Sequence, residues 1–187
     1  DCLLSRGLGD VYKRQSICNG RYFGIETNDK RFVVQNQKTL KCYVSKVKGF
    51  TKYIDKDFIK KDYNFWKIIT ARANGGKKYF GNMFIGNDTE VHSGSYISFK
   101  IKNKIEAESL LSYLKCKLPN ILLGLRKISQ DISGKTCKWI PLPPLDEIWT
   151  NEKIYKYYKL TKEDIKLITE TKISVSYTHL RAHETRG

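Results

Sequence analysis

The sequence predicts an α+β fold: a twisted, mainly antiparallel sheet, two central helices packed on it, and two C-terminal helices alongside. Residues 96–101 alternate between two sets of side chains with a period of two, which is typical of a strand with one buried face. Residues 107, 110, 111 and 114 are apolar and recur at the spacing of one helix face. Asn103 can cap that helix, and Glu106 stands where a side chain reaches back to the cap. Pro119 suits the first turn of a second helix with a broad apolar face.

The remaining elements follow from local patterns. We expect strands at residues 21–25, 31–35, 39–45, 50–54, 66–72 and 137–141. The first three would form a meander, because Asn and Asp between them favour turns. Residues 73–87, rich in glycine, basic and aromatic side chains, would form a flexible loop. Thr150 can cap a helix that extends through Tyr158. Thr161, with Asp164 three residues later, can cap a last helix that extends to about Lys172.

Length and composition narrow the possible functions. The chain has 187 residues, enough for one domain with a sizeable core, and a net charge of +16. Such a basic surface favours a polyanion, with nucleic acid first, although surface lysines of a lysine-rich proteome would give the same charge. No apolar run is long enough for a membrane helix, so we expect a soluble, cytoplasmic protein with no membrane partner. Five cysteines without a Cys-x-x-Cys pair argue against a disulfide framework or a structural zinc site.

Both ends of the chain look non-native. Residues 1–15 and 175–187 resemble translated sequencing adapters, and the chain starts with Asp1 while its only methionine is Met83. We therefore expect a fragment whose domain covers residues 16–174. Without the two tails the chain keeps 30 basic and 16 acidic residues, so the predicted domain remains strongly basic.

Several segments, in this order, resemble a known family. The central one comprises an extended Ser-Tyr-Ile-Ser-Phe segment, a helix containing Glu106-Ala107, a second helix and Ile-Ser-Gln-Asp. Together these are similar to the C-terminal target-recognition domain of Type II restriction-modification adenine methyltransferases, over roughly residues 20–172. The quoted segments are residues 22–25 with 27–28, 46–54, 67–75, 95–99, 106–107, 128–131, 139–141 and 149–155.

The resemblance implies a function and a missing partner. Such a domain selects the site on double-stranded DNA, while an N-terminal methyltransferase domain of the same polypeptide transfers a methyl group from S-adenosylmethionine. That reaction needs an Asn-Pro-Pro-aromatic loop, but here the Pro143-Pro144 pair lies between Leu142 and Leu145. We therefore predict no catalytic residue, cofactor or metal ligand in this fragment, and S-adenosylmethionine as the cofactor of the parent protein.

The predicted DNA contacts lie at a strand end and a helix end. Arg, Lys, Asn and Gln read base edges, while Lys also holds phosphates. The base-contact candidates are Arg72, Asn74, Arg126, Lys127 and Gln130, and the phosphate-contact candidates are Lys46, Lys48, Lys52, Lys77 and Lys78. The alternatives are solvated lysines, and local turn or cap hydrogen bonds for Asn74 and Gln130.

Other functions stay open. The specificity subunit of a Type I restriction system would carry two such domains joined by long helices. A small magnesium-dependent nuclease would use Asp146 with Asp164 and Lys166, although Asp164 falls at a predicted helix N-terminus. His179 and His183 have a zinc-binding spacing but lie in the C-terminal tail. A protein-interaction module would show a large exposed apolar patch without a basic groove.

Overall fold

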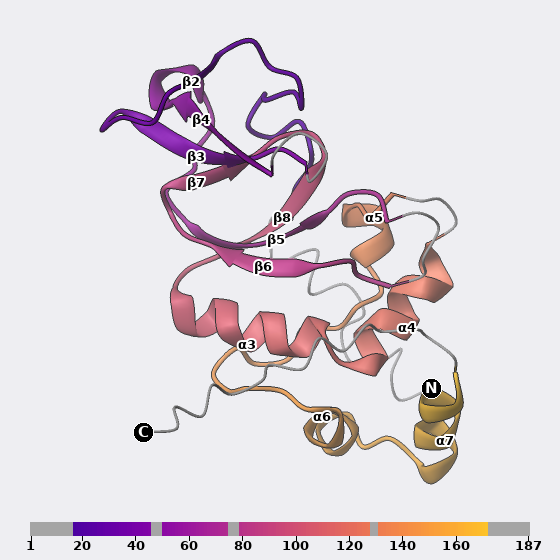
Figure 1. The fold of residues 1–187 in the computed structure, drawn as a ribbon. Coiled ribbons are helices and arrows are strands. Elements are labelled where there is room, and N and C mark those ends of the chain that lie inside the picture. Colours follow the sequence, from indigo (N-terminus) through magenta and orange to yellow (C-terminus); the bar gives the residue numbers. More distant parts are fainter. Residues whose placement is uncertain (1–16, 46–49, 75–78, 128–130, 172–187) are drawn as a thin grey trace, which may run out of the picture.

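The α+β prediction is confirmed, but the strands form two sheets where one was expected (Figure 1). The computed structural model describes residues 17–45, 50–74, 79–127 and 131–171. One four-stranded sheet has the order β1-β8-β5-β6 and the other β2-β4-β3-β7. Helices α3 and α4 lie along the first sheet, and α6 and α7 lie beyond them (Figure 1). Both predicted tails fall outside the described residues.

The first sheet contains the two strands that the sequence indicates best. β5 (Trp66–Ala71) and β8 (Tyr96–Ile101) pair antiparallel along their whole length, from Trp66 opposite Ile101 to Ala71 opposite Tyr96. β1 (Ile17–Cys18) extends the sheet beside β8. β6 (Met83–Gly86) pairs with β5, so the expectation of a flexible loop over residues 73–87 is wrong for this part.

The second sheet has a different topology from the predicted meander. β3 (Thr39–Tyr43) and β4 (Thr51–Asp55) form an antiparallel pair, and β2 (Phe32–Val33) pairs with β4 instead of β3. β7 (Glu90–His92), which was not predicted, runs parallel to β3. The strand expected at residues 21–25 is absent: residues 21–23 form a turn, and Gly24 after it is in the left-handed region.

The two central helices begin close to where the sequence places them. α3 (Lys104–Leu114) is capped by Asn103, whose Oδ1 accepts a hydrogen bond from the Glu106 N–H at 2.9 Å. α4 (Lys117–Arg126) starts two residues before Pro119. Proline is tolerated there, because an N–H in the first helical turn has no intrahelical partner to lose.

The C-terminal part contains three helices. α6 (Asn151–Tyr157) and α7 (Lys162–Glu170) are capped by Thr150 and Thr161, as predicted. The strand predicted at residues 137–141 is wrong. Residues 134–137 form the short helix α5 (Gly134–Cys137), because Ser133 and Thr136 make a reciprocal capping box at its start. A single 3₁₀ turn, η2 (Lys56–Phe58), follows β4.

Each sheet has its own apolar core. The larger core joins the inner face of the first sheet to α3, α4 and α6, and includes Phe99, Leu110, Leu123 and Ile154. The smaller core lies against the second sheet, around Ile54 and Cys42. Among the described residues, no helix is both long and apolar enough to cross a membrane.

Candidate nucleic-acid interface

The end of β5 and the chain leaving α4 meet at one place on the molecule. Ala73 and Asp131 form an isolated antiparallel bridge, and the Ile132 N–H donates to the Arg72 carbonyl at 2.8 Å. The Arg72 N–H in turn donates to the Ser95 carbonyl at 2.9 Å. This backbone framework fixes Arg72 from both sides while its side chain remains exposed. The end of β5 is therefore joined to the segment that follows α4.

The Arg72 side chain makes a loose ion pair. Its Nε lies 3.7 Å from Asp131 Oδ1, and about half of each side chain is exposed. Ion pairs of this kind contribute little to stability because water screens them. The guanidinium can therefore exchange the carboxylate for another anion at small cost.

Asn74 and Lys127 interact with each other. Asn74 Nδ2 donates to the Tyr79 carbonyl, and Asn74 Oδ1 accepts from Lys127 Nζ. Lys127 is buried, and burial lowers the pKa of its amine, partly opposed by the Asp131 carboxylate. These two predicted contact residues therefore hold the strand end to the helix end, and only the hydrogen bond from Asn74 to Tyr79 is local in the sequence.

Arg126 lies on the last turn of α4 with its side chain exposed. Its guanidinium carbon is 5.0 Å from the centre of the Trp139 ring, a cation–π arrangement. Trp139 is 40% exposed, so its ring and the guanidinium form a flat basic and aromatic surface. The sequence analysis did not name Trp139 as a contact residue. The sequence feature that could have indicated it is an aromatic residue followed closely by prolines.

Of the other predicted contacts, the structure describes Lys52 alone. Lys52 is exposed on β4, opposite Cys42 of β3, in the second sheet. The rest lie outside the described residues: Lys46, Lys48, Lys77, Lys78 and Gln130.

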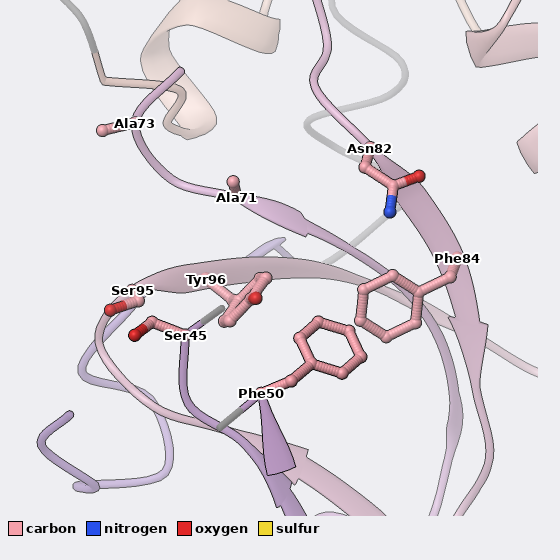
Figure 2. A pocket seen from close by; sticks show the side chains of 8 residues that line it. All are labelled: Ser45, Phe50, Ala71, Ala73, Asn82, Phe84, Ser95 and Tyr96. Carbon is pink, nitrogen blue, oxygen red and sulfur yellow. The ribbon is translucent and has the colours of Figure 1, made fainter. Parts of the chain in front are cut away.

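A pocket of about 240 Å³ opens beside the end of β5 (Figure 2). Three aromatic rings, from Phe50, Phe84 and Tyr96, form part of its wall. Small or polar side chains complete the lining: Ser45, Ala71, Ala73, Asn82 and Ser95. Sequence reasoning missed this site, because its residues lie on or close to five strands that are far apart in the sequence: β3, β4, β5, β6 and β8.

Asp164 and Lys166 of the nuclease alternative interact within α7, where Lys166 Nζ lies 3.9 Å from Glu170 Oε1. Asp164 completes the capping box of α7, where its Oδ2 accepts from the Thr161 N–H at 3.0 Å. No cluster of three or more His, Cys, Asp or Glu side chains suited to a metal ion occurs in the part of the chain that the structure describes. His179 and His183 lie outside that part.

Neither a protein-family model nor a curated protein nor a solved structure matches the chain significantly. A functional assignment therefore depends on the residues and their geometry.

Proposed function

We propose that this chain recognises double-stranded DNA as the target-recognition domain of a restriction-modification adenine methyltransferase. The observation that carries the proposal is the junction of β5 with the end of α4, from which Arg72 and Arg126 extend exposed guanidinium groups. The net charge of +16 and the resemblance of the sequence to such domains support it.

Each residue of the junction has a defined part in this proposal. Arginine can hold a phosphate or donate two hydrogen bonds to the major-groove edge of guanine. Arg72 would do so after leaving Asp131, and Arg126 would do so while stacked on Trp139. Asn74 and Lys127 act as positioning residues, because their hydrogen bond connects the two elements that carry the arginines.

The reaction itself belongs to another part of the parent protein. A separate methyltransferase domain would bind S-adenosylmethionine and receive the target adenine after it is extruded from the duplex. This chain would decide where that happens, and alone it would transfer no methyl group. With cellular DNA as its partner, it would act in the cytoplasm.

Binding is tested by fluorescence anisotropy with a labelled duplex over a series of salt concentrations. We expect log Kd to depend linearly on log salt, because bound phosphates release counterions. Arg72→Ala should weaken binding and, if Arg72 holds a phosphate, reduce the salt slope by about 1. Lys104→Ala, at an exposed position of α3, is the matched control and should bind like the unmodified chain. A salt slope near zero would contradict the proposal.

Sequence selection needs a second measurement. Repeated selection from a pool of duplexes with a randomised centre should enrich one short sequence. If Arg126 contacts a base, Arg126→Ala should reduce the preference for one base at one position of the enriched sequence. If it contacts a phosphate instead, the substitution should weaken binding to all sequences equally.

A further inference from the structure

The pocket beside β5 is lined by aromatic rings from both sheets. Phe84 of β6 and Tyr96 of β8 belong to the first sheet, and Phe50 directly precedes β4 of the second. The ring centres of Phe50 and Phe84 are 5.9 Å apart, and those of Phe84 and Tyr96 are 6.3 Å apart. The ring of Tyr43, on β3, packs against the ring of Phe84, with the two ring centres 4.6 Å apart. Figure 2 shows the Phe50 and Phe84 rings side by side, with Tyr96 next to them.

The backbone of Phe50 is strained in a way that presents its ring to the pocket. Its φ is 63°, in the left-handed region that bulky residues rarely adopt. Two backbone hydrogen bonds hold it there: Phe50 N–H donates to the Ser45 carbonyl at 2.7 Å, and Val44 N–H donates to the Phe50 carbonyl at 2.9 Å. Strain of this kind persists where the surrounding structure enforces it, and it concentrates at binding sites.

The rest of the lining suits the edge of a flat polar molecule. The exposed Asn82 amide at the rim offers both a donor and an acceptor. Ser45 and Ser95 carry hydroxyl groups opposite the rings (Figure 2). The Ser95 hydroxyl is 2.7 Å from the hydroxyl of Thr27, which fixes its position.

The volume and the lining of the pocket narrow the class of ligand further. A volume of about 240 Å³ lies below the roughly 300–1,000 Å³ typical of pockets for drug-sized molecules. It suits a single planar ring system. Ala71 and Ala73 line the pocket on either side of Arg72 in the chain, whereas the Arg72 side chain is not part of the lining. A flat ring with polar groups on its edge would fit both the volume and the lining.

We propose that this aromatic pocket binds one nucleobase that has left its stack in the bound DNA. The inference rests on the proposed function and adds a base site to the arginines of the junction. The Phe50 and Phe84 rings are tilted by 57° to each other, so one of them would stack on the base, which is a sequence-tolerant contact, and the other would meet its edge. Asn82 would pair with the polar edge of the base. Opening one base pair of a duplex frees such a base.

The test compares two single-stranded oligonucleotides of equal length and charge, one of thymidines and one of abasic sugar-phosphate units. Stacking contributes about 1–3 kcal/mol per base, so the unmodified chain should bind the thymidine strand at least about fivefold more tightly. Phe50→Gly removes one ring and suits the left-handed backbone, so it should fold and abolish most of that difference. Phe84→Leu should do the same while keeping an apolar side chain.

Phe58→Ala is the matched control, because Phe58 is an exposed ring outside the pocket, under the Arg31 guanidinium. It should leave both affinities unchanged. Equal binding of the two strands by the unmodified chain would overturn the inference, as would an undiminished difference in both pocket variants. These results can occur with salt-dependent duplex binding intact, which separates failure of the pocket from failure of the proposed function.

Discussion

His92 is a histidine enclosed by protein at the end of β7. Its Nδ1 lies 3.0 Å from the Ser93 carbonyl, and its Nε2 lies 3.0 Å from the Ser98 hydroxyl. A carbonyl oxygen can only accept, so Nδ1 carries the ring proton and Nε2 accepts from Ser98. Burial lowers the pKa of His92 to about 4, with a smaller contribution from the charge of Lys67. The folded protein therefore keeps this ring neutral.

Acid should destabilise the fold through His92. Because the pKa of the folded form is below the ordinary value of 6.5, the unfolded chain binds the extra proton first. The contribution is fully present above pH 6.5 and falls as the pH drops toward 4, by on the order of 3 kcal/mol in total. We expect the free energy of unfolding, measured by urea titration, to be lower at pH 4.5 than at pH 7. The difference should be smaller for His92→Gln.

Asp29 provides the control for that experiment. Its hydrogen bonds with Arg31 lower its pKa to about 2, so its contribution is lost mainly below its ordinary value of 3.8. Asp29→Asn should therefore leave the loss between pH 6.5 and 4.5 unchanged. Equal losses in the unmodified chain and His92→Gln would show that His92 does not titrate in this way.

At the scale of elements, α7 depends on its N-terminal cap as well as on the packing of one buried side chain. Ile168 is the buried side chain of this helix, whereas Leu167 is 69% exposed. Thr161 and Asp164 satisfy two backbone N–H groups reciprocally. Thr161→Ala should lower the free energy of unfolding of α7 by about 1 kcal/mol, seen as faster amide hydrogen exchange in residues 162–170.

The same substitution at Thr169 is the control. The Thr169 hydroxyl donates to carbonyls of its own helix, at Ile165 and Lys166, and the residue is exposed. Alanine has the higher helix propensity, so Thr169→Ala should leave exchange unchanged or slow it. An equal acceleration in both variants would mean that the cap is not what stabilises α7.

The elements that could be predicted are those whose determinants are local. The caps at Asn103, Thr150 and Thr161 and the alternation in residues 96–101 each lie within a few residues of what they specify. β1 and β7 have two and three residues, too few to show a period, and depend on partners far along the chain. The strand predicted at residues 137–141 failed because the Ser133 capping box starts a helix that ends at Cys137.

The candidate site divides in the same way. Residue type and position indicated Arg72 and Arg126, and both are exposed. The burial of Lys127 could not be predicted, because its hydrogen-bond partner Asn74 follows β5, 53 residues earlier in the sequence. The pocket brings together residues from two sheets, so only the tertiary structure shows it.

At the scale of the whole molecule, Lys67 connects the two sheets. It projects from β5, and its Nζ donates to the Asn87 carbonyl at 2.6 Å and to the Glu90 carbonyl of β7 at 2.8 Å. A third hydrogen bond reaches the Tyr63 carbonyl at 3.2 Å. Burial still lowers the pKa of Lys67 to about 8. The sheets therefore meet through polar contacts as well as through the aromatic rings beside the pocket.

The apolar cores on both sheets contain buried thiols, which predicts a loss of stability in alkali. Burial raises the pKa of Cys18 to about 11 and those of Cys42, Cys116 and Cys137 to about 12, from an ordinary value of 9.0. A raised pKa in the folded state means that stability is fully present below pH 9. It is lost as the pH rises toward these values, because the unfolded chain releases its thiol protons first.

Cys42 of β3 is the position at which this can be measured. Between pH 9 and 10.5 the free energy of unfolding from urea titrations should fall, and Cys42→Val should reduce the slope by up to about 1.4 kcal/mol per pH unit. Leu40→Val on the same strand alters the core without removing a titrating group, so it should keep the original slope. Lys67 and the tyrosines titrate alike in these variants and cancel in the comparison. Burial disfavours a thiolate at Cys42 because apolar side chains enclose the thiol. If Cys42→Val and Leu40→Val gave the same slope, ionisation of Cys42 would not be the cause of the loss of stability in alkali.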